Sequence, residues 1–301
     1  MAWKVISAVA VTAIACAPAV TAAAQPGSAR PAVAVHLAAA AHPGSAAHLG
    51  SAARANAKKG VSVWTFRGVG TALKRSGASW YYTWAAGHSG VTSPPGVQFV
   101  PMIWGAGNVT AATLRQVKRQ GHDLLAFNEP DSRSQANLTV SRALSLWPRL
   151  MGTGMQLGSP AVADDAATPG GWLDQFMRGA GARHYRVNFI TVHWYGSDFA
   201  TRRAVGQLRS YLQAIHNRYH KPLWLTEFAL IRFGSTVSFP TSRQQAAFVT
   251  AATSMLEHLS FVQRYAWFAL PATPGDGSAG LFRPGAAATA AGRAFEAVDK
   301  P

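Results

Sequence analysis

The segment "DLLAFNEPD" at residues 123–131 is an apolar run that ends on a carboxylate. Its apolar residues are typical of a buried strand, whereas a carboxylate such as Glu129 is rarely buried without a partner. Pro130 ends the strand directly after Glu129. The segment "KPLWLTEFA" at residues 221–229 repeats this arrangement with Glu227. Because the chain has only 12 acidic residues, two acids that each close an apolar strand point to a shared role.

The chain from Lys59 onward alternates short apolar, aromatic or β-branched runs with helical stretches, which is typical of a parallel sheet. The predicted strands lie at residues 61–66, 79–84, 97–104, 123–129, 155–162, 187–195, 222–228 and 264–270. Closed into a ring, these eight strands predict an α/β fold, a compact (β/α)8 TIM barrel in a single domain. The structural alternative is an open doubly wound sheet. Such a sheet carries a Gly-rich phosphate turn after its first strand, where this chain offers only Gly68 and Gly70.

In a (β/α)8 barrel, side chains at the C-terminal ends of different strands face one pocket. Glu129 closes the fourth predicted strand and Glu227 closes the seventh, so ring closure would bring both carboxylates over the same mouth. Paired carboxylates about 5–5.5 Å apart suit a retaining glycosidase, whereas an inverting one needs about 6.5–9.5 Å. The alternative interpretation makes each glutamate one half of a structural ion pair.

The residues before the predicted barrel have a different composition. Residues 1–24 carry one early lysine, an apolar run and small residues before Gln25, as a secretory signal peptide does; a membrane anchor is the rival interpretation. Residues 25–58 are rich in Ala, Gly, Ser and Pro and predict a disordered linker. Cys16, the single cysteine, lies in a faint lipoprotein-like box, which makes lipid anchoring a minor alternative to secretion. We therefore expect a secreted protein whose catalytic domain is residues 59–301.

The charge of the chain is strongly positive, with 28 Lys and Arg against 12 acids and a formal net charge of +16. Such a field attracts polyanions. The basic residues are nevertheless scattered, and no signature of a nucleic-acid-binding module accompanies them. We expect a basic solvated surface with loose association to anionic cell-wall polymers, a monomer, and no nucleic-acid partner.

Three segments together resemble a known clan of enzymes. "FNEPD" at residues 127–131, "ITVHWYG" at residues 190–196 and "WLTEFA" at residues 224–229 are similar to the fourth-, sixth- and seventh-strand motifs of the retaining glycosidases built on (β/α)8 barrels. Within that clan, the chain most resembles glycoside hydrolase family 128, the small endo-β-1,3-glucanases with an Asl1-like catalytic domain. The resemblance spans roughly residues 60–300. It implies a polysaccharide substrate of the β-glucan class, and the residues indicate neither a cofactor nor a metal site.

The resemblance also implies roles for five residues. Glu129 would be the general acid/base and Glu227 the nucleophile of a double displacement. Asn128 would donate a hydrogen bond to the sugar 2-hydroxyl, and Tyr195 would hydrogen-bond Glu227. His193 has the same strand parity as Tyr195 and is predicted to line the same mouth.

Aromatic residues are the second class of candidates, because their faces can cover the apolar side of a sugar ring. Trp267, near the end of the eighth predicted strand, matches the clan's aromatic platform beneath the cleaved sugar. Trp104, at the end of the third, is a candidate for a neighbouring subsite. Trp224 has the opposite parity to Glu227 and is predicted to face the helices. Three aromatic residues share one face of the second strand and could be packing or cleft wall: Trp80, Tyr82 and Trp84.

Two other functions fit the same residues. A retaining endo-glycosidase could act on β-1,4-glucan or mannan with the same pair of acids. A non-catalytic surface protein could bind glucan through its tryptophans without cleaving it. Retention of both glutamates in the Asn-Glu-Pro context favours the enzyme.

Overall fold

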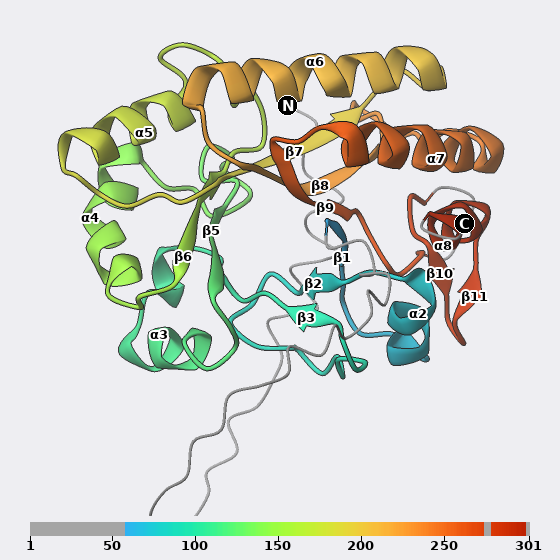
Figure 1. Cartoon of the computed structure of the whole chain (residues 1–301), viewed down its shortest axis with the longest axis horizontal. Coiled ribbons are helices and arrows are strands. Elements are labelled where there is room, and N and C mark those ends of the chain that lie inside the picture. The colour runs from blue at the N-terminus through green and yellow to red at the C-terminus, as the bar shows by residue number, and fades with distance from the viewer. Residues whose placement is uncertain (1–57, 274–277, 299–301) are drawn as a thin grey trace, which may run out of the picture.

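The computed structural model describes residues 58–273 and 278–298 (Figure 1). The predicted signal peptide, and the predicted linker up to residue 57, lie outside the described residues. Within the described part, no helix has both the length and the apolar character that crossing a membrane requires.

Parallel strands form the centre of the fold, and every predicted strand region overlaps at least one of them. They are β1 (Lys59–Ser62), β2 (Trp80–Tyr82), β3 (Gln98–Phe99), β4 (Met102–Ile103), β5 (Asp123–Asn128), β6 (Gln156–Ala161), β7 (Ile190–Gly196), β8 (Leu223–Leu230) and β9 (Val262–Trp267). A short antiparallel hairpin follows, of β10 (Phe282–Arg283) and β11 (Ala287–Ala288).

Helices alternate with these strands and lie around their outside (Figure 1). They are α2 (Val69–Ser76), η1 (Ala106–Asn108), α3 (Ala111–Val117), α4 (Val140–Met151), α5 (Trp172–Ala182), α6 (Thr201–Tyr219), α7 (Ser242–His258) and α8 (Ala290–Ala297). In the described chain, no α-helix separates β2 from β3. That connection contains Pro94 and Pro95 between glycines, a composition that ends helices rather than forming them.

The strands belong to two sheets rather than one. One sheet has the order β3-β2-β1-β9-β8-β7 and the other the order β4-β5-β6. Only Val100 and Pro101 separate β3 from β4, and Pro101 has no N–H to donate to a ladder, which explains the interruption. On the other side, isolated parallel bridges join β6 to β7 at Gly158↔Phe189 and Val162↔Val192. The result is an α/β fold with parallel strands.

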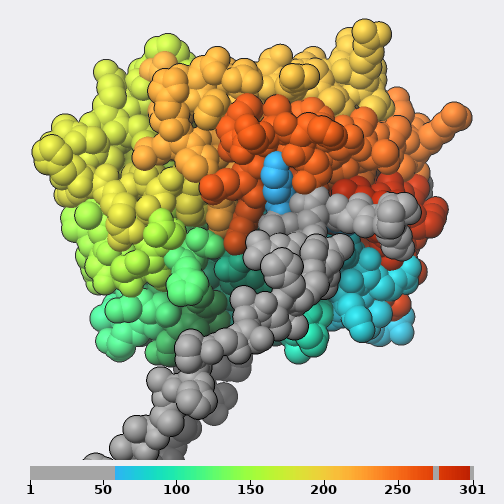
Figure 2. Space-filling model, viewed as in Figure 1, coloured from blue at the N-terminus to red at the C-terminus, as the bar shows by residue number. Residues whose placement is uncertain are grey.

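The outward face of the strands packs against the helices. Phe127 of β5 contacts Trp147 of α4, with ring centroids 6.2 Å apart, and Phe228 of β8 contacts Phe248 of α7 at 6.4 Å. All four side chains are fully buried, and burial of each is worth about 1.5–3 kcal/mol. The space-filling view shows α6 and α7 packed against each other along one side of the molecule (Figure 2). These two helices pack on β7 and β8, which carry part of the candidate site.

The inward face of the strands forms a second, aromatic cluster. It consists of Trp80, Tyr82, Trp84, Val100, Met102, Leu125, Phe189, Trp224 and Ala266. The Arg264 guanidinium lies over the rings of Trp80 and Trp224 in this cluster, at 5.5 and 4.3 Å from their centroids. This cluster is the floor below the ends of β2, β5 and β8.

The position of Trp224 corrects the prediction that it faces the helices. Its ring stacks on Phe189 at a centroid distance of 4.1 Å, within the inward cluster. The cause is a bulge in β8. Along the β7–β8 pair the partner shifts from Leu225 to Glu227 as β7 advances by one residue. One extra residue on β8 reverses the alternation, so Trp224 and Glu227 both point inward.

Candidate active site

The end of β5 has an irregular backbone that presents two adjacent side chains to the same space. Its pairing with β6 shifts register between Leu124 and Asn128. Phe127 and Glu129 have positive φ values of 25° and 42°, which are strained for residues other than glycine. Neighbouring strands hold this shape, because Glu129 N donates to Ala161 O at 2.7 Å. Such strain persists where the surroundings over-determine it, and it is concentrated at functional sites.

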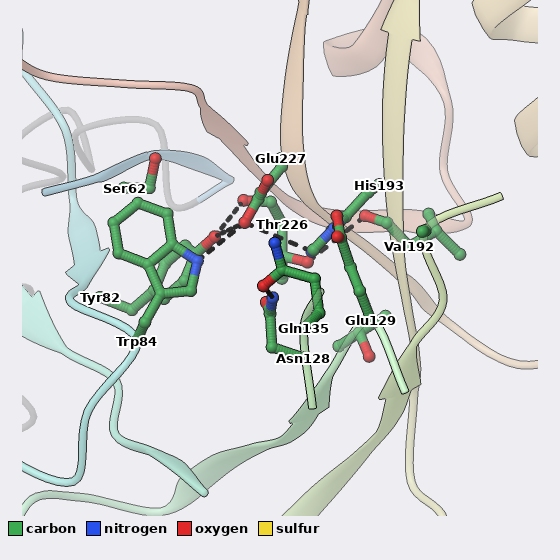
Figure 3. Close-up of polar contacts among 12 residues, drawn as sticks. Ser62, Tyr82, Trp84, Asn128, Glu129, Gln135, Val192, His193, Thr226 and Glu227 are labelled. Atoms are coloured by element: carbon green, nitrogen blue, oxygen red, sulfur yellow. Dashed lines mark hydrogen bonds and ion pairs between the residues drawn. The ribbon is translucent and has the colours of Figure 1, made fainter. Parts of the chain in front are cut away.

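The structure brings Glu129 and Glu227 together around His193 (Figure 3). His193 Nδ1 lies 3.0 Å from Glu129 Oε1, and His193 Nε2 lies 3.6 Å from Glu227 Oε1. One ligand atom from each of the three residues lies within 4.8 Å of the others. All three are buried: Glu129 is 5 % exposed, Glu227 4 % and His193 1 %. Two carboxylates therefore share one nearly enclosed space across an imidazole.

Three neutral donors hold the Glu227 carboxylate. Trp84 Nε1 donates to Oε1 at 2.8 Å and the Tyr82 hydroxyl donates to the same atom at 3.2 Å. The Tyr195 hydroxyl donates a short hydrogen bond to Oε2, which is the contact that the sequence predicted for it. Hydrogen bonds to a carboxylate stabilise its negative charge and fix its direction.

Trp84 and Tyr82 are the site residues that sequence reasoning did not identify as such. It left them as packing or cleft wall. The available signal was their position, since they occupy the same face of the second strand at its C-terminal end, where barrel side chains reach the mouth. Their partner could not be known, because Glu227 lies 143 and 145 residues away along the chain.

Burial and charge act on the protonation of the site in opposite directions. Burial raises the pKa of Glu129, and the hydrogen bond and charge of His193 offset this only in part. Burial alone would lower the pKa of His193, but the negative charges of Glu227 and Glu129 outweigh it, so this pKa is raised. Burial, followed by the charge of Glu227, raises the pKa values of Tyr82 and Tyr195 well above 10.0. Both phenols therefore remain protonated donors.

Asn128 lies beside this pair and is 4 % exposed. Its Nδ2 donates to Gln135 Oε1 at 3.3 Å, while its Oδ1 is buried with no hydrogen-bond partner. A buried amide oxygen without a partner is uncommon. The contact of Asn128 with the sugar 2-hydroxyl stays a prediction.

The prediction for Trp267 as an aromatic platform needs correction. Trp267 is fully buried on the outward face, with its ring 5.0 Å from that of Phe228, and its Nε1 donates to Ala279 O at 2.8 Å. Alternation along β9 turns Ala266 inward and Trp267 outward. The residue after Trp267 reaches the site instead. The Phe268 ring lies 5.5 Å from that of Tyr195 and is only partly buried.

Two partly buried tryptophans border the same space. Trp104 packs against the inward cluster at the end of β4, in keeping with the prediction that it lies near the site. Trp64, just beyond β1, lies 6.1 Å from the Trp84 ring. A pocket of about 180 Å³ is formed in part by His193 and Tyr195. It is lined by Ala163, Asp164, His193, Trp194, Tyr195, Tyr211 and Phe233.

Glu129, His193 and Glu227 are also of the residue types that bind metal ions. Most of their ligand atoms are engaged with other protein groups. His193 Nδ1 and Glu129 Oε1 are hydrogen-bonded to each other, and both Glu227 oxygens accept hydrogen bonds, whereas His193 Nε2 has no hydrogen-bond partner. The hydrogen-bonded carboxyl groups fit an acid/base and a nucleophile better than a set of metal ligands.

Residues 60–295 match the family described as "Glycosyl hydrolase catalytic core". This chain belongs to that family. Within it, the chain is a glycoside hydrolase of family 128, as its motifs predicted. A family 128 subgroup I endo-β-1,3-glucanase from Amycolatopsis mediterranei, solved with laminaritriose, is 55% identical with a TM-score of 0.77, over 80% of this chain and 99% of that one.

More distant relatives of this family 128 hydrolase share the fold. A subgroup II endo-β-1,3-glucanase from Sorangium cellulosum is 27% identical with a TM-score of 0.68, over 81% of this chain and 99% of that one. The alkali-sensitive linkage protein 1 of Schizosaccharomyces pombe is 31% identical over 204 residues, which are 65% of this chain. The match covers 35% of that yeast protein, so the chain spans about a third of its length.

Proposed function

We propose that this family 128 hydrolase is a secreted, retaining endo-β-1,3-glucanase that uses Glu129 as acid/base and Glu227 as nucleophile. The observation that carries the proposal is the approach of the two carboxylates, with one oxygen of each within 4.8 Å. This approach is nearer to the about 5–5.5 Å typical of retaining enzymes than to the about 6.5–9.5 Å of inverting ones, which supports a retaining mechanism. The substrate class is supported by the Amycolatopsis mediterranei relative, which was solved with laminaritriose.

In the first step, Glu227 attacks the anomeric carbon of the glucosyl unit bound between the two acids. The bond from that carbon to the glycosidic oxygen breaks, and Glu129 gives its proton to this oxygen as the leaving sugar departs. The raised pKa of Glu129 supports this role, because the group must hold a proton near neutral pH. The three donors to Glu227 support the other role, because they aim an anionic nucleophile.

In the second step, Glu129 acts as a base. It removes a proton from a water molecule, whose oxygen attacks the anomeric carbon and displaces Glu227. The product then has the β-configuration of the substrate, and both acids return to their starting states. His193 contacts both carboxylates, so we assign it to balancing their charge. Asn128 would donate to the 2-hydroxyl of the reacting sugar.

We also infer that the two sheets are parts of one closed (β/α)8 barrel. The isolated bridges between β6 and β7 and the two-residue interruption between β3 and β4 support closure on both sides. The contacts among side chains of β2, β7 and β8 and the residue after β5 also support this inference, because strands of a closed barrel present their C-terminal ends to one mouth.

Secretion is proposed from the composition of residues 1–24. N-terminal sequencing of protein recovered from the culture medium tests it, with a start at Gln25 expected. Retention of the protein in the cell with Met1 intact would contradict it.

The central experiment incubates the purified protein with laminarin and with β-1,4-glucan and β-mannan. Reducing ends should appear from laminarin, as internal fragments, and early products followed by NMR should be β-anomers. Glu129→Gln and Glu227→Gln should each lower turnover by orders of magnitude while the far-UV circular dichroism spectrum stays unchanged. Near-normal hydrolysis by either variant, or α-anomers as first products, would overturn the proposed mechanism.

A further inference from the structure

Gln135 is brought back over the end of β5 by the loop that follows Glu129. Ala136 N donates to Asn128 O at 3.1 Å and Leu138 N donates to Pro130 O at 2.8 Å. These backbone bonds fold the loop onto the strand that it has just left. In the view of Figure 3 the Gln135 carboxamide stands next to that of Asn128 and projects toward the centre of the site.

The side chain of Gln135 is not needed to hold this loop. The loop is tied by backbone bonds, including Gln135 N to Ser132 O at 3.1 Å. The carboxamide is partly exposed, and its hydrogen bond to a described residue is the one that Oε1 accepts from Asn128 Nδ2 at 3.3 Å. A glutamine that contributed only to loop structure would have its polar atoms bonded within the loop.

Asn128 needs an external group to fix its direction. The two ends of an amide are nearly equal in size, so the hydrogen-bond partners decide which end faces which way. In the observed pairing Gln135 Oε1 accepts from Asn128 Nδ2, and turning over the Asn128 amide alone would place its Oδ1 against that oxygen. With Oδ1 buried and without a partner, no other described side chain fixes this amide through that atom.

We propose that Gln135 is a positioning residue that holds the Asn128 amide toward the 2-hydroxyl of the glucosyl unit lying between Glu129 and Glu227. It acts through Asn128, and the inference rests on the proposed function. Asn128, held by Gln135, would hydrogen-bond the ring hydroxyl on the carbon next to the reacting one. A contact there strengthens as charge develops on the ring, so Gln135 should affect turnover more than binding.

The test compares Gln135→Leu with the unmodified full chain on two substrates. One is an aryl β-laminaritrioside, and the other is the same compound lacking the 2-hydroxyl on the reacting unit. With the first, kcat should fall about three- to tenfold, the effect of one hydrogen bond, while KM stays within about twofold. With the 2-deoxy compound, where Asn128 has no hydroxyl to meet, the two proteins should differ by less than about twofold.

Ser134→Ala is the matched control, since Ser134 lies on the same loop and its hydroxyl pairs with Ser132 at 3.1 Å at the exposed surface. It should leave kcat unchanged on both substrates. Thermal unfolding of each variant should match that of the unmodified protein. An equal loss of kcat on both substrates, or no loss on the substrate that has the 2-hydroxyl, would overturn the role of Gln135 and leave the proposed function standing. An unmodified protein that cleaves neither compound nor laminarin would overturn the proposed function, and this inference with it.

Discussion

Glu129 directly follows β5, whereas Glu227 lies within β8, which continues to Leu230. The two residues are of the same type, yet their surroundings differ. Among the described side chains, only His193 hydrogen-bonds the Glu129 carboxylate, and burial raises the pKa of Glu129. The Glu227 carboxylate instead accepts from Tyr82, Trp84 and Tyr195. The number of donors thus separates an acid suited to carry a proton from a carboxylate suited to attack.

The largest difference between the two glutamates is expected when each is replaced by alanine and the two variants are assayed with and without azide. Each change should lower turnover of laminarin by roughly 10³-fold or more. Azide should restore cleavage of an activated aryl laminarioside by both variants, but on opposite faces of the sugar. Glu227→Ala should yield the α-glycosyl azide and Glu129→Ala the β-glycosyl azide, both distinguishable by NMR. The same anomer from both variants would contradict the assigned roles.

Removing one donor to Glu227 should have a smaller effect. Replacement of Trp84 by Phe deletes the 2.8 Å hydrogen bond to Oε1. A hydrogen bond to a charged group is worth about 1.5–3 kcal/mol, so kcat should fall roughly 10- to 100-fold. Tyr82→Phe, whose bond is longer at 3.2 Å, should cost less. Steady-state kinetics on laminarin measure both, and equal activity of Trp84→Phe and the unmodified protein would remove Trp84 from the site.

Replacement of the outward-facing Trp267 should separate stability from activity. Trp267→Phe leaves a gap in the contact with Phe228 and removes the bond to Ala279. The free energy of unfolding should fall by about 1–3 kcal/mol in urea denaturation, with kcat within about twofold of normal. A large fall in kcat without loss of stability would restore the original prediction that Trp267 contacts substrate.

The fall of kcat at alkaline pH should report the pKa of Glu129, the proposed acid. Glu129 must be protonated to assist departure of the leaving sugar, so kcat falls as the pH rises through its pKa. Because burial raises that pKa above 4.5, the alkaline limb lies above the range of an ordinary glutamate. His193 lowers the pKa of Glu129, so His193→Ala should move this limb to higher pH. A shift of the alkaline limb to lower pH would contradict the assignment.

Asp174, a carboxylate outside the site, has a lowered pKa where Glu129 has a raised one, and its replacement should have the smallest effect. Asp174 accepts from Gly170 N and Arg218, and these bonds lower its pKa. Its stabilising contribution is therefore present above the pKa of the unfolded chain and is lost as the pH falls through the folded one. Asp174→Asn should lower the free energy of unfolding at pH 7 by about 1 kcal/mol or less. The difference should vanish in strong acid, as urea denaturation at several pH values can check.

Much of the site was accessible from the sequence because its signals are local. The apolar runs before Glu129 and Glu227 identified both strands. The three motifs at residues 127–131, 190–196 and 224–229 together identified the family. The bond from Tyr195 to Glu227 followed from the same motifs. What failed was counting parity along regular strands. It placed Trp224 outward, whereas the structure has it in the inward cluster. The resemblance to the clan placed Trp267 beneath the cleaved sugar, whereas the structure has it buried on the outward face.

By itself, the sequence determined which segments become buried strands and which acid accompanies each of the two, because hydrophobic periodicity is a property of neighbouring positions. It placed the end of the strand at Glu227 too early, since β8 continues to Leu230. Tertiary structure alone decided which way the side chains point. The bulge in β8 depends on how that strand pairs with β7, and the donors to Glu227 come from β2 and β7. The register of β7 and β8 and the contacts of Tyr82 and Trp84 with Glu227 join residues far apart in the chain, so the apolar pattern of either segment does not encode them.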